Sequence, residues 1–231
     1  MTELDLVTPE LEGQPPGVVL AWAARRFAPR IVFATGFGLE GCVLVDLIGR
    51  SALPIDVFTL DTGVLFRETY ELWRELEART GVTIRAVRPE RTIEEQASDL
   101  GPELWRRDPD RCCELRKVLP LRAALAGQEA WITAIRRDQT PERATARVVE
   151  RDERFGLVKV NPLVAWSAAD VGRYLRENGV PTSPLFERGY ASVGCEPCTT
   201  PCRPGEDPRA GRWRGQGKTE CGIHRRVKKN S

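Results

Sequence analysis

The stretch that decides the fold is Ile31-Val32-Phe33-Ala34-Thr35-Gly36-Phe37-Gly38-Leu39-Glu40-Gly41. It opens with a short apolar run, passes through a glycine-containing loop and leads into residues 42–48, which have the pattern of an apolar helix. A strand, a glycine loop and a helix in this order point backbone N–H groups at an anion. The loop lacks the Gly-Lys-Ser/Thr ending of the ATPase phosphate loop, so we expect it to bind phosphate or sulfate without a loop lysine and its magnesium ion. A tight turn without a ligand is the simpler alternative.

The rest of the chain repeats this alternation of strands and helices. Further strands are predicted at 54–60, 82–87, 131–135 and 157–163. Helices are predicted at 18–27, 66–79, 91–100, from about 110 onward, and from Ser167, a candidate N-cap, to about 178. Nearly continuous apolar strands separated by helices indicate an α/β fold with a Rossmann-like, mostly parallel sheet. Ligands bind such sheets at the carboxyl ends of the strands, where Leu60 and the first loop both lie.

Composition fits a soluble globular protein. The chain has 231 residues, of which 41% are hydrophobic and 29% charged, and a net charge of +2. This balance predicts no strong attraction to nucleic acid or to a membrane, and the acidic N-terminus does not resemble a signal peptide. We therefore expect a cytoplasmic protein. The sequence is also compatible with a homo-oligomer. Residues 1–180 are expected to form the nucleotide-binding α/β domain, and 181–231 an irregular arm rich in proline, glycine and cysteine that a hydrophobic core alone would not order.

The seven cysteines suggest metal binding or catalysis, because a chain of this size does not need disulfides in a reducing compartment. Cys112 and Cys113 are adjacent, and Cys195 and Cys198 form a C-x-x-C turn followed by Cys202. Zinc usually takes two well-separated pairs. Adjacent side chains on a helix diverge by about 100°, which suits a larger [4Fe–4S] cluster better than one small ion. From spacing alone a cluster, zinc and unligated thiols all remain open, and Cys202 is expected to be an ordinary thiol.

Two charged segments are candidate sites. Residues 136–143 follow a predicted strand and contain three arginines, which are either solvated or bind an anionic ligand through bidentate guanidinium contacts. The segment 218–224, Lys-Thr-Glu-Cys-Gly-Ile-His, contains Cys221 and the single histidine of the chain, His224. Nearby cations favour the nucleophilic thiolate form of cysteine, so Cys221 is a candidate nucleophile. The alternative is a basic tail with an incidental thiol.

Over residues 30–224 the chain resembles the assimilatory sulfonucleotide reductases, and in particular the iron–sulfur, thioredoxin-dependent adenylylsulfate (APS) reductases. The resemblance rests on pieces that occur in order along the chain: 35–40, 60–63, 112–121, 136–139, 159–163, 189–190, 194–199, 209–213 and 218–224. It implies an adenine nucleotide alpha hydrolase-like fold and reduction of APS to sulfite and AMP in sulfate assimilation. Cys221 would attack the sulfate sulfur to give an S-sulfocysteine, and thioredoxin, or a glutaredoxin-like donor, would release sulfite.

The resemblance also implies a set of site residues. A [4Fe–4S] cluster would be held by Cys112, Cys113, Cys195 and Cys198. The nucleotide would be bound by Thr35, Gly36, Phe37, Gly38, Glu40 and Leu60. Cationic substrate contacts would come from Lys117, Arg136, Arg143, Arg209 and Arg212. His224 would orient or deprotonate Cys221, unless it is an exposed histidine without a role.

Some residues depart from the family pattern. Ala134 and Thr140 replace the usual glycine and serine, and the first loop is closer to that of cluster-free 3′-phosphoadenylylsulfate (PAPS) reductases. Reduction of PAPS, or of both nucleotides, therefore remains an alternative. An ATP pyrophosphatase-type ligase and a non-catalytic metal-binding regulator are the competing functions. A Ser-His-Asp hydrolase is disfavoured, because the single histidine lies in the tail with no nucleophile elbow before it.

Overall fold

The computed structural model describes residues 9–218 and 220–223. Within these residues the chain forms a six-stranded sheet in the order β3-β2-β1-β4-β6-β5. All neighbouring strands are parallel except β5 and β6, which are antiparallel. The strands are β1 (Ile31–Thr35), β2 (Asp56–Leu60), β3 (Ile84–Val87), β4 (Ala130–Ile132), β5 (Val149–Asp152) and β6 (Leu157–Val160). The expected mostly parallel α/β sheet is therefore confirmed.

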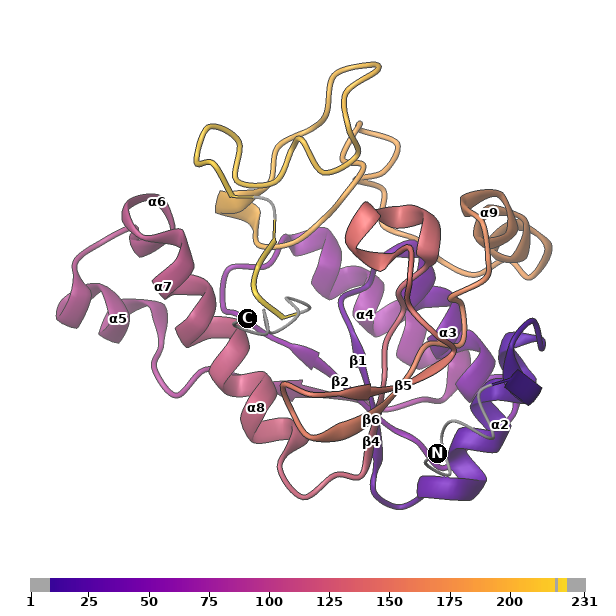
Figure 1. The fold of residues 1–231 in the computed structure, drawn as a ribbon. Helices are drawn as coiled ribbons and strands as arrows, with labels where there is room; N and C mark the ends of the chain where they lie inside the picture. Colours follow the sequence, from indigo (N-terminus) through magenta and orange to yellow (C-terminus); the bar gives the residue numbers. More distant parts are fainter. Residues whose placement is uncertain (1–8, 219, 224–231) are drawn as a thin grey trace.

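Helices connect the strands and cover both faces of the sheet (Figure 1). The α-helices are α2 (Pro16–Phe27), α3 (Leu39–Arg50), α4 (Arg67–Thr80), α5 (Ile93–Leu100), α6 (Leu104–Arg107), α7 (Pro109–Cys113), α8 (Leu119–Leu125) and α9 (Ala168–Glu177). A π-helix, η1 (Glu114–Val118), joins α7 to α8, and short 3-10 turns occur at η2 (Arg137–Gln139), η3 (Pro141–Arg143) and η4 (Glu196–Cys198).

The central strand β1 divides the core into two layers. Ile31 and Phe33 pack into the larger buried cluster, which also contains residues of α2, α3, α4 and α9. Val32, between them, faces the opposite layer, where α8 contributes Leu121 and Leu125. This alternation is the period-two pattern of a strand. Both faces of β1 are apolar, which suits its place between β2 and β4 in the middle of the sheet. Packing of the two core layers against it fixes its carboxyl end from both sides.

The boundaries of the predicted helices agree with the structure to within two or three residues, although α6 was not predicted. Two strand predictions need correction. β4 ends at Ile132 instead of residue 135, and β6 ends at Val160 instead of 163. β5 was not predicted at all. Its sequence, Val149-Glu150-Arg151-Asp152, is mostly polar because it forms the edge of the sheet and pairs only with β6. An edge strand of this kind needs no apolar run.

The C-terminal arm has little regular structure. From residue 181 onward, the described part of the chain contains η4 and two isolated bridges, Leu65 with Cys195 and Thr199 with Arg212. In Figure 1 the arm, coloured orange to yellow, lies above α4 and α7, and its last described residues return toward the middle of the molecule. Cys113, Cys195, Cys198 and Trp213 form a third buried cluster, separate from the two core layers.

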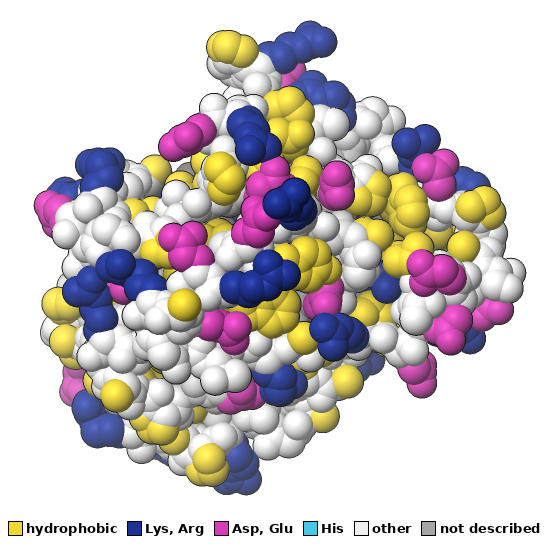
Figure 2. Space-filling view, turned by 180° about the vertical axis from the view of Figure 1, so that it is seen from behind, with side chains coloured by type: hydrophobic (Ala, Val, Ile, Leu, Met, Phe, Trp, Pro, Cys, Tyr) yellow, Lys and Arg dark blue, Asp and Glu magenta, His cyan; other side chains and the backbone are white. Residues whose placement is uncertain are grey.

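On the face drawn in Figure 2, Lys and Arg side chains are interspersed with Asp and Glu. None of the helices within the described ranges has the length and apolar character that crossing a bilayer requires.

Candidate functional site

The strand order places a binding site beside β1. The chain runs from β1 outward through β2 to β3 and then returns to the other side of β1 as β4. In open α/β sheets, ligands bind at this point of reversal, outside the carboxyl ends of the strands. The loops that follow β1 and β4 flank it, so the first glycine loop and the arginine-rich segment 136–143 lie on the two sides of one candidate site.

The loop after β1 has a fixed, unusual conformation. Phe37 has a φ of 57° and a buried ring that stacks on Trp73 with centroids 5.7 Å apart. Its backbone N–H donates to Thr35 Oγ1 at 3.2 Å. A Cβ at Gly41 would lie 2.8 Å from the same hydroxyl oxygen, so the first turn of α3 can approach only as glycine. No side chain caps α3 at Gly38, which leaves the N-terminus of a twelve-residue helix facing the point of reversal.

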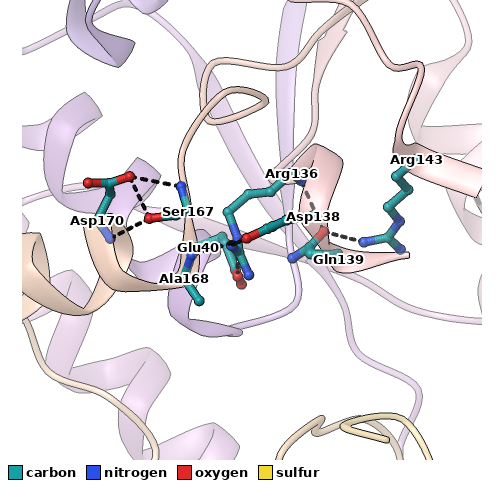
Figure 3. A network of polar contacts seen from close by, with 8 residues as sticks. All are labelled: Glu40, Arg136, Asp138, Gln139, Arg143, Ser167, Ala168 and Asp170. Carbon is teal, nitrogen blue, oxygen red and sulfur yellow. Dashed lines mark hydrogen bonds and ion pairs between the residues drawn. The ribbon is translucent and has the colours of Figure 1, made fainter. Parts of the chain in front are cut away.

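Arg136 connects the two loops (Figure 3). Its guanidinium bonds Glu40 at 2.9 Å and Asp138 at 2.6 Å, and the side chain is buried. Its backbone N–H donates to Gln139, whose side-chain oxygen also accepts from Arg143. Glu40 and Arg136, both predicted to contact the nucleotide, thus contact each other. In this arrangement they fix the spacing between the loop after β1 and the loop after β4.

Cys221 lies among cations from three different segments. Burial opposes the charged form of Lys117, but the Cys195 and Cys221 thiolates overcome it and raise the pKa of the ammonium group. Burial lowers the pKa of Arg212, and the charge of Cys221 acts against that shift. Burial also lowers the pKa of Arg143, and the charges of Glu220 and, to a lesser extent, Cys221 act against that shift. Lys117, Arg143 and Arg212 thus all interact electrostatically with Cys221.

Glu220, the residue before Cys221, forms ion pairs with two of the predicted substrate arginines. Its carboxylate lies 3.0 Å from Arg209 Nη2 and 3.7 Å from Arg143 Nη2. All three side chains are about one-fifth exposed, with values of 15% to 24%. Arg143 comes from η3, after β4, whereas Arg209 comes from the arm. The carboxylate therefore ties the arm to the sheet domain at the candidate anion site.

Trp213 anchors the remaining cations. The Arg212 guanidinium lies 4.5 Å from its ring centroid, and the ammonium groups of Lys218 and Lys117 lie 5.4 and 5.9 Å away. Lys218 also pairs with Asp110 at 2.5 Å. Arg212 Nε is buried without a hydrogen-bond partner among the described residues. A guanidinium held with an unpaired donor is suited to an anionic acceptor that the protein itself does not supply.

Four cysteines line one cavity beside these cations. The wall also includes Trp105 and Lys117, and the cysteines are Cys112, Cys113, Cys195 and Cys198. All seven cysteines, which lie within the described residues, are free thiols. Cys195 Sγ lies 3.2 Å from the Thr62 hydroxyl. Residues far apart in the sequence thus bring both cysteine pairs to the same place.

The thiols affect one another electrostatically. Burial, followed by repulsion from the other three thiolates, raises the pKa of Cys112 to about 12, and a similar combination raises that of Cys198 to about 11. Burial also acts on Cys195, but Lys117 and the Thr62 hydroxyl reverse it and lower the pKa of that thiol. The four thiol groups therefore differ in how readily they lose a proton, Cys195 more readily than Cys112 or Cys198. Within ranges 9–218 and 220–223, no group of three or more His, Cys, Asp or Glu is arranged to hold a single metal ion.

Cys112 and Cys113 are both buried at the end of α7. The helix continues as the π-helix η1, whose wider turn changes the direction of the side chains that follow. Arg116, on η1, donates to the Thr62 carbonyl at 2.6 Å and to Gln96 at 3.2 Å. These bonds fix the wall of the cavity against the end of β2.

The structure brings most predicted site residues into one region, at the carboxyl edge of the sheet. Leu60 ends β2 and packs against the same core layer as Ile223, so the tail reaches that edge. His224 lies outside the described residues. Sequence reasoning assigned no contact to Glu220, Trp105 or Trp213. Glu220 stands in the motif beside Cys221, but spacing does not reveal which distant arginines a carboxylate meets.

Sequence comparisons assign the chain to one family. A profile of the phosphoadenosine phosphosulfate reductase domain matches residues 30–201. Adenosine 5′-phosphosulfate reductase of Geobacillus thermodenitrificans is 47% identical over 207 residues, which cover 89% of this chain and 88% of the relative. Adenosine 5′-phosphosulfate reductase 1 of Bacillus subtilis is 46% identical over 207 residues, covering 89% of each chain.

Solved structures agree with the fold. Phosphoadenylyl-sulfate (PAPS) reductase from Candida auris, crystallised with phosphate, has 33% identity and a TM-score of 0.78, covering 87% of this chain and 98% of that one. Candida glabrata FMN adenylyltransferase has 15% identity and a TM-score of 0.55, covering 86% and 65%, which is a likeness of fold alone.

Proposed function

Since the chain belongs to the phosphoadenosine phosphosulfate reductase family, we propose that it reduces adenosine 5′-phosphosulfate to sulfite and AMP. The observation that carries this proposal is the position of Cys221. Its thiol lies within the electrostatic reach of Lys117, Arg143 and Arg212. A nucleophile near several cations suits an anionic nucleotide that carries an electrophilic sulfur, and the start of α3 at the reversal point of the sheet offers uncapped N–H groups to the same kind of ligand.

In the proposed reaction the Cys221 thiolate attacks the sulfur of the sulfate group. A sulfur–sulfur bond forms, the bond from sulfur to the bridging oxygen breaks, and AMP leaves with the electron pair. Negative charge builds up on the departing phosphate, where Arg143, Arg209 and Arg212 would stabilise it. The product on the enzyme is an S-sulfocysteine.

Thioredoxin, or another small dithiol protein, would complete the cycle. One of its thiolates attacks the S-sulfocysteine, and its second thiol closes a disulfide as sulfite leaves and Cys221 is restored. Both electrons come from the dithiol, so no separate redox step is needed. We propose that His224 orients or deprotonates Cys221 in these steps.

We propose that Cys112, Cys113, Cys195 and Cys198 hold a [4Fe–4S] cluster. Support comes from the cavity that all four line and from the chemistry of the donors, which are four thiols in mutual repulsion beside a buried lysine. When bound, the cluster would supply a positive core that the thiolates ligate, and it would not pass electrons in this scheme. Lys117, on the wall of the cavity, would lie between this group and Cys221.

Reduction of PAPS is a second candidate substrate activity. The two nucleotides differ by a 3′-phosphate, and the solved structure with 33% identity and a TM-score of 0.78 is that of a PAPS reductase. The curated relatives with 46% to 47% identity are named for the nucleotide without that phosphate, which favours APS.

The test is an intact-mass measurement on anaerobically purified protein mixed with APS, or with PAPS, in the absence of thioredoxin. We expect a mass increase of one SO3 group that Cys221→Ser abolishes and Cys202→Ser, the matched control, retains. Addition of reduced thioredoxin should remove the adduct and release sulfite. Absence of the adduct with both nucleotides, on protein that contains its iron, would refute the proposed reaction.

A further inference from the structure

Glu220 carries a negative charge, which opposes the proposed role of the arginines that it contacts. Its carboxylate pairs with Arg209 at 3.0 Å and with Arg143 at 3.7 Å. In the proposed function these two arginines bind the phosphosulfate of the nucleotide. The guanidinium group binds carboxylate, phosphate and sulfate through the same planar set of donors. One pair of arginines cannot satisfy the carboxylate and the substrate fully at the same time.

We propose that Glu220 is a positioning residue that occupies, in the ligand-free chain, part of the place taken by the anionic end of the nucleotide. Binding of the nucleotide displaces the carboxylate and thereby moves Cys221. This inference rests on the proposed function, since it takes Arg143 and Arg209 to be substrate contacts. It adds a link between occupation of the anion site and placement of the nucleophile.

The link follows from the way in which the tail is held. On one side of Cys221, the tail is fixed by the two ion pairs of Glu220 and, further back, by the pair of Lys218 with Asp110. On the other side, Arg154 donates to the carbonyl oxygens of Gly222 and Ile223, and Ile223 packs against the core. Gly222 has a φ of 89°, a conformation that glycine adopts without strain.

Release of Glu220 therefore removes the side-chain contacts nearest to Cys221 on one side, while Lys218 further back and Gly222 and Ile223 on the other side stay anchored. The thiol would then turn about Gly222 toward the site from which the carboxylate has gone. Because coupling between two events is reciprocal, a change that weakens the Glu220 pairs must also favour anion binding. The side chains are partly exposed, so the competing ion pairs are of moderate strength.

The first experiment measures AMP affinity by calorimetry on iron-loaded protein. Glu220→Gln keeps the size of the side chain and removes the charge, so AMP should bind about threefold to tenfold more tightly than to the unaltered protein. Glu206→Gln is the matched control, because Glu206 also pairs with an arginine of the arm, Arg214, at 2.7 Å. Its AMP affinity should not change. Equal or weaker binding by Glu220→Gln overturns the proposal.

The second experiment uses no nucleotide. Alkylation of Cys221 by iodoacetamide is followed by peptide mass spectrometry, and we expect it to be faster in Glu220→Gln than in Glu206→Gln, because the tail is released. Equal rates would refute a positioning role. Failure of the proposed function would be seen separately, as the absence of AMP binding and of the Cys221 adduct in the unaltered protein. The alkylation rates would still decide whether Glu220 holds Cys221.

Discussion

Lys117 interacts both with the cysteine cavity and with Cys221 on the tail. It is buried on the wall of the cysteine cavity, and the charges that most raise its pKa are those of Cys195 and Cys221. A buried ammonium group is costly unless it faces opposite charge. The position of Lys117 is therefore best explained by the thiolates on both sides of it, one in the cavity and one on the tail.

Replacement of Lys117 by methionine should slow formation of the Cys221 adduct by about 10²-fold or more, the usual cost of removing one preorganised contact to developing charge. Methionine keeps most of the buried volume. Lys159→Met is the control, because Lys159 is similarly buried but pairs with Glu150 on the neighbouring strand, at 3.1 Å. Single-turnover rates measured by rapid quench distinguish the two variants, and equal rates would exclude Lys117 from the reaction.

At the residue scale, residue types and their order single out the cysteine pairs, the loop 35–40 and Cys221 as candidates, and their roles stay predictions. The partners of Glu220 could not be predicted in this way, because η3 and the arm lie far apart in the chain and meet only in the fold. Arg136 was predicted to bind the nucleotide, yet its buried guanidinium contacts Glu40 and Asp138. Pairings between distant charges depend on tertiary structure that spacing does not encode.

Among the elements, α9 begins at a capping box that the sequence reveals, and the helix then packs on α3. Ser167 was predicted as its N-cap, and its hydroxyl accepts from the Asp170 N–H at 3.2 Å while the Asp170 carboxylate accepts from the Ser167 N–H at 2.9 Å. The hydrogen bonds from Ser167 lower the pKa of Asp170 to about 2. The helix packs on α3 through Tyr174, which donates to the buried Asp46.

Ser167→Ala should lower the free energy of unfolding by about 0.5–2 kcal/mol, since it leaves N-terminal N–H groups of α9 without their acceptor. Urea unfolding followed by circular dichroism measures the change. Ser51→Ala is the control, because Ser51 is exposed at the end of α3, and its effect should stay within about 0.5 kcal/mol. Equal effects of the two substitutions would show that the capping box does not stabilise the fold.

Strands and helices differed in how well the sequence predicted them. Capped, amphipathic helices such as α4 and α9 carry their own end signals, and Gly81, with a φ of 69°, marks the end of α4. The polar edge strand β5 has neither an apolar run nor alternation, because it pairs on one side only. The π-helix η1 was also missed, since a π-turn has no distinct residue pattern and is stabilised here by the tertiary bonds of Arg116.

The whole molecule combines a sheet domain that two apolar layers hold together with an arm that depends on a third cluster. The two layers draw most of their strand residues from β1, β2, β4 and β6, and few from β3 and β5. Among the described residues beyond 180, Ile223 is the one that packs against either layer, at the margin of the smaller one. The third cluster is small and consists of Cys113, Cys195, Cys198 and Trp213. Because so few apolar contacts hold the arm, its order should depend on the proposed [4Fe–4S] cluster.

Loss of iron should therefore release the arm and leave the sheet domain folded. After anaerobic chelation, trypsin should cleave faster at Arg188 and Arg214, which are exposed residues of the arm. Cleavage at Arg176, exposed on α9, should not change, and the far-UV dichroism should largely remain. Cys195→Ser should behave like the chelated protein, and Cys202→Ser should keep its iron and sulfide, because Cys202 lies outside the cavity wall. Global loss of helical signal on removal of iron would contradict this division, as would an arm that stays equally protected.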